Sequence, residues 1–180
     1  MKAQAAVSRG SSTINVYVLA GILAIITLVQ STVVTKITIF GVSPDLVLLF
    51  VVATVLIGGA REGLLVSLIG GLVADILSGA PFGLTTICLV AVNYIVGMGE
   101  MNIFRTAGIW PYLAVIVATV AYNIMFLLLL QITGRNVLWG PMLWRVLAPS
   151  LVVNALFMPL MYILVRWLCS HMRPKPVEWE

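Results

Sequence analysis

The strongest constraint on this chain is the near absence of charge along most of its length. The sequence passes through six apolar segments: Asn15–Val34, Asp45–Gly59, Glu62–Ser78, Phe82–Gly99, Pro111–Thr133 and about Met142–Leu168. Charged residues make up 9% of the chain and hydrophobic residues 62%, whereas soluble domains carry about 25% charged residues. A water-soluble surface cannot be built from so few charges, so the sequence predicts an integral membrane protein.

The segment lengths predict an all-α polytopic membrane protein with six transmembrane helices in one bundle, because about 20 mostly apolar residues cross a bilayer. The second and third segments are short, and the linker Gly59-Ala60-Arg61-Glu62 between them predicts a tight hairpin. The sixth segment is too long for a straight span, and a kink or break is expected near Pro149. The predicted parts are an N-terminal tail (1–14), a six-helix transmembrane domain (15–168) and a C-terminal tail (169–180).

The lysines and arginines predict the orientation, because cytoplasmic loops carry an excess of them. With the N-terminus in the cytoplasm, seven cations fall on the cytoplasmic side and three on the outer side. The seven are Lys2, Arg9, Arg61, Arg105, Arg166, Arg173 and Lys175, and the three are Lys36, Arg135 and Arg145. Six spans return the C-terminus to the cytoplasm. The cations are scattered, which does not indicate a nucleic-acid partner.

The third segment has a face of small residues. On a helical wheel this face comprises Ser67, Gly70, Gly71, Ala74, Asp75 and Ser78, with Gly63 at its edge. Most of the large aliphatic residues fall outside it. Small residues let a second helix approach closely, which is how helices associate inside a membrane. We expect this face to pack against a neighbouring helix; the alternative is that it lines a cavity.

The stretch DILSGAPFGL at 75–84 places a carboxylate beside a turn. At 1.5 Å rise per residue, Asp75 lies ~20 Å from the cytoplasmic boundary of a ~30 Å hydrocarbon core. A charge at that depth needs a partner within the protein. One candidate partner is the set of free N–H groups in the turn Ser78-Gly79-Ala80-Pro81-Phe82-Gly83 and at the new helix terminus, with Pro81 in the first turn of that helix. The other is Arg145. We expect Asp75 to fasten this outer hairpin, with ligand or proton binding and partner contact as alternatives.

The other polar groups predict structural roles. Ser43-Pro44-Asp45 is typical of a helix start, with Ser43 as N-cap, Pro44 as first helical residue and Asp45 on the positive end of the helix dipole. Gln30 and Asn154 can form hydrogen bonds between helices. The single histidine, His171, and the absence of a Cys/His cluster predict no catalytic residue, no metal site and no cofactor.

Several short motifs together resemble the family of the bacterial rod shape-determining protein MreD. They are QST at 30–32, FGVSPD at 40–45, PDLVLL at 44–49, REG at 61–63, DILSGAPFGL at 75–84 and PSLVVNAL at 149–156. The resemblance covers roughly residues 20–168, and the D-x-L-S-G-x-P-F-G run is its most specific element.

The resemblance implies a multi-pass protein of the bacterial inner membrane that belongs to the cell-elongation (rod) complex and supports cell shape and lateral peptidoglycan synthesis. It implies a non-enzymatic scaffold whose direct partner is MreC, with MreB and the peptidoglycan synthases reached directly or through MreC. Homodimer formation is left open. It also implies a fold similar to the substrate-binding subunits of energy-coupling-factor transporters. That fold suggests an alternative function, a vitamin-binding subunit whose pocket would use Asp75, Asn93, Gln30 and Asn154. A third class, considered apart from the fold, is an intramembrane enzyme.

Overall fold

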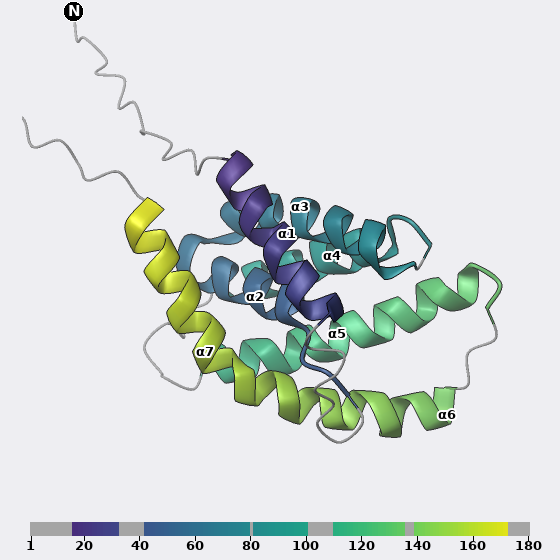
Figure 1. Cartoon of the computed structure of the whole chain (residues 1–180). Helices are drawn as coiled ribbons and strands as arrows, with labels where there is room; N and C mark the ends of the chain where they lie inside the picture. The colour runs from purple at the N-terminus through teal and green to yellow at the C-terminus, as the bar shows by residue number, and fades with distance from the viewer. Residues whose placement is uncertain (1–15, 33–41, 80, 101–109, 136–138, 173–180) are drawn as a thin grey trace, which may run out of the picture.

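The computed structural model describes residues 16–32, 42–79, 81–100, 110–135 and 139–172, all of which belong to helices or their short connections. The helices are α1 (Val16–Thr32), α2 (Leu46–Gly58), α3 (Ala60–Ser78), α4 (Leu84–Glu100), α5 (Trp110–Ile132), α6 (Trp139–Met142) and α7 (Ala148–Met172), with a π-helical stretch, η2 (Leu143–Leu147), between the last two. Figure 1 shows them in a single bundle. The five predicted apolar segments before Met142 coincide with α1 to α5, and the sixth corresponds to α6, η2 and α7. The predicted tail at 1–14 lies outside the described residues, and α7 continues past the predicted boundary at Leu168.

Helix α2 is the centre of the bundle. It contacts α1, α3, α4, α5 and α7, and every residue from Val47 to Val55 is buried. Its sequence, LVLLFVVATVLIG, has no polar face. A helix that is apolar all round is typical of complete burial. The buried core is assembled around this helix, with Leu23 of α1, Val66 of α3 and Met158 of α7 among its neighbours.

The α2–α3 connection is the tight hairpin that the sequence predicts, and it is shorter than expected. Gly59, at φ 89°, ends α2 and immediately precedes α3. Because few residues other than glycine adopt a positive φ, Gly59 lets the chain reverse within a single position. The amide of Gly59 donates to the Val55 carbonyl, and its own carbonyl accepts from Gly63. The two helices therefore pack as a pair.

Helix α3 buries its small face, as predicted. The buried residues are Gly63, Val66, Ser67, Gly70, Gly71 and Asp75. A Cβ atom on Gly71 would lie 2.5 Å from the Thr86 Cα of α4, and one on Gly70 would lie 3.2 Å from a Val47 methyl group of α2. Ala74 is half-buried and Ser78 is exposed, so the packed face ends before the last turn. Glycine is what permits these close approaches.

The last helical region is continuous, but it changes from π-helical to α-helical near Pro149, where the sequence predicts a kink or break. Pro149 has no N–H with which to bond the Arg145 carbonyl one turn back, and its ring crowds that carbonyl. The π-helical stretch η2 lies directly before this turn. Pro159 lies inside α7, and Figure 1 shows α7 changing direction along its length, as prolines cause.

Two helical stretches, Pro111–Ile132 and Trp144–His171, are long and apolar enough to cross a membrane by length and composition. Three shorter apolar helical stretches, Ala20–Thr32, Leu46–Gly58 and Leu84–Gly99, fall below that length. Helical architecture is therefore established for the described residues, while the count of six spans stays a prediction.

Candidate functional site: two carboxylates that join the helices

Asp75 receives hydrogen bonds from the turn that follows it and from the start of α4. Its carboxylate oxygens accept from the backbone N–H of Gly83 (3.0 Å), Thr85 (2.9 Å) and Thr86 (3.1 Å). The Thr86 hydroxyl donates a fourth bond of 2.7 Å. Asp75 itself is 3% exposed. The first N–H groups of a helix have no partner within it, so one carboxylate here satisfies several of them at once and complements the positive end of the helix dipole. Gly83 lies in the turn, and Thr85 and Thr86 lie in the first turn of α4; the sequence predicted donors from both places.

The turn itself departs from the expected geometry in one respect. Gly79 (φ 63°) ends α3 in the left-handed conformation, and Gly83 (φ 91°) directly precedes α4. Placing Pro81 in the first helical turn was wrong, since α4 begins at Leu84 and Pro81 precedes it in the turn. The Leu84 amide donates to the Pro81 carbonyl at 3.3 Å. Phe82 projects outward and is 71% exposed.

Arg145 is not the partner of Asp75. It lies exposed on η2, and η2 makes no contact with α3 within the described chain. The backbone donors after Asp75 are nearer in sequence, and both oxygens of the carboxylate already accept hydrogen bonds from them. Sequence reasoning predicted amide donors at the helix start without naming Thr85 and Thr86, and it missed the Thr86 hydroxyl. The available signal was LTT at 84–86, hydroxyl side chains in the first turn after a glycine turn.

Asp45 performs the capping role at the start of α2. It is the N-cap residue, and its side chain accepts from the Leu48 amide at 3.1 Å. Assigning the N-cap to Ser43 and the first helical position to Pro44 was therefore wrong by two positions. The physical reason is that the carboxylate of Asp45 reaches the third amide of the helix, which is the standard N-cap bond. Pro44 is buried just ahead of the helix.

Asp45 also joins α2 to two other helices. The Gln30 side chain of α1 donates to the Asp45 carboxylate (3.2 Å) and accepts from the Val47 amide (3.0 Å). The backbone N–H of Asp45 donates to the Asn154 side-chain oxygen of α7 (3.0 Å).

Asn154 extends this network to a fourth helix. Its amide nitrogen donates to the hydroxyl of Thr119 on α5 at 3.2 Å. The network therefore links α1, α2, α5 and α7. Sequence reasoning singled out Gln30 and Asn154 but not Thr119, which has no distinguishing neighbour in the sequence.

Both networks consist of hydrogen bonds within the bundle. Both carboxylates are occupied by amides and hydroxyls of the bundle, and no group of three or more His, Cys, Asp or Glu residues that could hold a metal occurs in the part of the chain that the structure describes. Hydrogen-bonded polar groups of this kind are suited to fixing which helices pair, since an unsatisfied polar group is costly in hydrocarbon.

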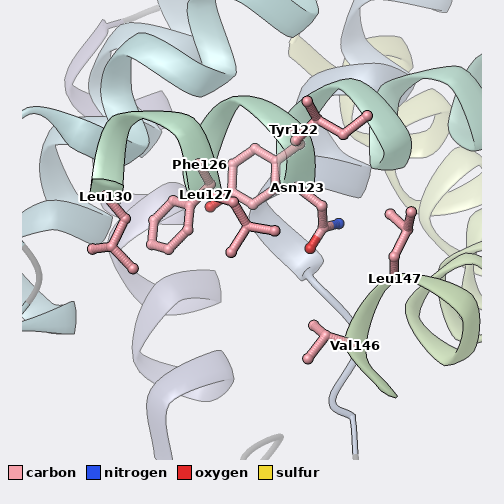
Figure 2. A pocket seen from close by; sticks show the side chains of 8 residues that line it. Tyr122, Asn123, Phe126, Leu127, Leu130, Val146 and Leu147 are labelled. Carbon is pink, nitrogen blue, oxygen red and sulfur yellow. The ribbon is translucent and has the colours of Figure 1, made fainter. Parts of the chain in front are cut away.

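An apolar pocket lies between α5 and η2. Its volume is about 230 Å³, and it is lined by Tyr122, Asn123, Ile124, Phe126, Leu127, Leu130, Val146 and Leu147. In Figure 2 the labelled α5 side chains face Val146 and Leu147 across the opening. The Asn123 side chain donates to the Thr119 carbonyl (2.8 Å). None of the four residues expected to line a vitamin pocket belongs to this one.

The bundle has the organisation of a helical membrane protein: small and polar residues of α3 face inward, while large aliphatic residues such as Leu72 and Ile76 face outward. A comparison with protein-family models also places the chain among membrane proteins. Residues 11–172 match the family described as rod shape-determining protein MreD, and the chain belongs to that family. The family consists of membrane proteins of cell-shape determination and is not a known enzyme family. Neither the curated proteins nor the solved structures contain a significant match, so the similarity to transporter subunits stays a prediction.

Proposed function

We propose that this protein is a non-enzymatic scaffold of the cell-elongation complex, embedded in the inner membrane and bound to MreC. The observation that carries this proposal is the family match over residues 11–172. The polar networks support it, because the carboxylates of Asp45 and Asp75 accept hydrogen bonds from neighbouring parts of the bundle and so join its helices. MreB and the peptidoglycan synthases would be reached through MreC.

The proposed topology has six spans with both termini in the cytoplasm. The short helix α2 would cross within the bundle, where neighbouring helices cover it. The short helix α4 is covered on one face, and its exposed face carries apolar side chains such as Ile87 and Met98. Reporter fusions after Gly99 and after Glu180 should report the cytoplasm, and a fusion after Thr133 should report the periplasm. A periplasmic C-terminus would contradict the six-span count.

The outer faces of α1 and α7 are the proposed contact surface for a single-span partner. Helix α1 packs against α2 and α3, and its exposed face carries Ile25, Leu28 and Val29. The exposed face of α7 carries Val152, Leu156, Leu160 and Ile163. Apolar side chains on such faces can pack against another helix through van der Waals contact.

Depletion of the protein from a rod-shaped host tests the function directly. Cells should become round while their membrane stays intact, and MreC should co-purify with the protein from solubilised membranes. Depleted cells that keep their rod shape, together with purification that recovers no cell-wall component, would contradict the scaffold function.

The vitamin-binding alternative is less well supported by the geometry. Three of its four expected pocket residues, Asp75, Gln30 and Asn154, are engaged in hydrogen bonds within the bundle. Mass spectrometry of the purified protein separates the two functions: a retained vitamin-like molecule would favour the transporter subunit over the scaffold.

A further inference from the structure

The α5–η2 pocket is bordered by two arginines. Arg145 directly precedes the lining residues Val146 and Leu147. Arg135 follows the end of α5, and its backbone N–H donates to the carbonyl of Leu130, a third lining residue, at 3.3 Å. Both arginine side chains are exposed, and neither forms an ion pair within the ranges that the structure describes. An apolar pocket therefore lies beside two available positive charges.

Tryptophans mark the depth of this site. Trp144 is 80% exposed next to Arg145, and the Trp139 indole N–H donates to the Gln131 side chain at 2.9 Å, which ties the start of α6 to the end of α5. Tryptophan is enriched at the level of lipid headgroups. The lining residues of α5 run from Leu130 back to Tyr122, a distance of about 12 Å along the helix axis. The pocket therefore extends from the headgroup level into the region of the acyl chains.

We propose that the α5–η2 pocket binds an acyl chain of a phospholipid with an anionic headgroup, whose phosphate lies against Arg135 and Arg145. The proposal rests on the membrane embedding stated under the proposed function. Charge complementarity selects this occupant, because an apolar partner helix would leave both arginines without a counter-ion. Val146 and Leu147 belong to the π-helical stretch η2, and such stretches are frequent at functional sites.

The test uses the full-length protein in phosphatidylcholine nanodiscs that contain traces of a photoactivatable lipid, with the reactive group in the acyl chain. Phosphatidylglycerol and phosphatidylcholine probes are compared, and labelled peptides are identified by mass spectrometry. Peptides of α5 and η2 should be labelled more strongly by the phosphatidylglycerol probe. Equal labelling by both probes would overturn the proposal, as would crosslinks from this pocket to another protein in native membranes.

Charge and shape are then tested separately. The double variant Arg135→Gln/Arg145→Gln should reduce the preference for phosphatidylglycerol roughly tenfold, since each cation near a membrane surface favours anionic lipid several-fold. Arg166→Gln, an exposed cation near the other end of α7, is the matched control and should keep the preference. An unchanged preference for phosphatidylglycerol in the double variant would overturn the proposal. This result does not depend on whether the pocket-filling variant Leu127→Trp folds.

Leu127→Trp, which fills the pocket, should reduce labelling by both probes. Leu128→Trp, at the exposed neighbouring position, should leave it unchanged, and equal loss in both variants would count against the pocket. Extraction with alkaline carbonate separates this inference from the proposed function. Release of the chain from membranes contradicts the embedding itself, whereas an embedded chain without lipid preference contradicts only the lipid site.

Discussion

Helices α2 and α3 are neighbours with opposite organisation. Helix α2 is uniformly aliphatic and is buried on every side from Val47 to Val55. Helix α3 buries glycines, Ser67 and Asp75, and exposes its large side chains, with Ile76 70% exposed. In water this arrangement of α3 would be inside out. It is favourable in lipid, because the surroundings of the bundle are then as apolar as its interior. Helices associate there through close approach of their backbones and through hydrogen bonds between polar groups.

The comparison predicts that the same change in side-chain volume or polarity affects the stability of the protein differently in the two helices. In α2 the loss of volume should be destabilising. In α3 the loss of volume on the outer face should be tolerated, whereas added volume or lost polarity on the inner face should not. Four substitutions, each measured as the unfolding free energy in detergent, test this from the largest effect to the smallest.

Phe50→Ala in α2 should have the largest effect. Phe50 is among the largest fully buried side chains, and its truncation leaves a cavity that the surrounding helices cannot close. We expect the unfolding free energy to fall by about 3 kcal/mol. Most of this comes from the cavity, because lipid is as apolar as the core and the transfer of the side chain contributes little. A loss below about 1 kcal/mol would show that α2 is not the rigid centre of the bundle.

Asp75→Leu should be next, at about 2 kcal/mol, because the turn amides and the Thr86 hydroxyl lose their shared acceptor. Asp75→Asn should be milder, since it keeps a neutral acceptor oxygen. Normal thermal stability of the Leu variant would contradict the fastening role and favour ligand or partner binding at Asp75.

Gly71→Ala should cost about 1–2 kcal/mol, because the new methyl group would meet the backbone of α4 at Thr86. Gly21→Ala is the matched control, since a Cβ atom there has open space around it. Equal stability of the two variants would argue against close packing of α3 on α4.

Ile76→Ala should have the smallest effect, within about 0.5 kcal/mol, although it removes more apolar volume than the glycine variant adds. Ile76 lies on the outer face, beside Asp75 in sequence. A loss comparable to that of Phe50→Ala would mean that another protein or a second copy covers this face in the purified sample.

Much of the architecture could be predicted because it depends on local patterns. The apolar segments located α1 to α5, Gly59 marked the hairpin, and Pro149 marked the change from π-helix to α-helix, since each acts through backbone geometry within a few residues. The small face of α3 was also predictable, because helical periodicity alone brings its residues together. The exact helix starts, after Asp45 and at Leu84, were not predictable. Several neighbouring side-chain oxygens can accept hydrogen bonds from the first amides of a helix, and the folded geometry decides which of them caps it.

The sequence by itself determined that this chain is a helical membrane protein, and it located the carboxylate of Asp75 beside the turn donors that bind it. Only the tertiary structure decided that α2 is the centre, that Asp45 joins Gln30 to Asn154, and that a pocket lies beside Arg145. Helix α2 has no polar face, but inside a membrane an apolar helix can face lipid as readily as protein, so its sequence alone does not place it at the centre. Gln30 and Asn154 lie far apart in the sequence, and their meeting at Asp45 depends on how whole helices pack, which no local pattern encodes.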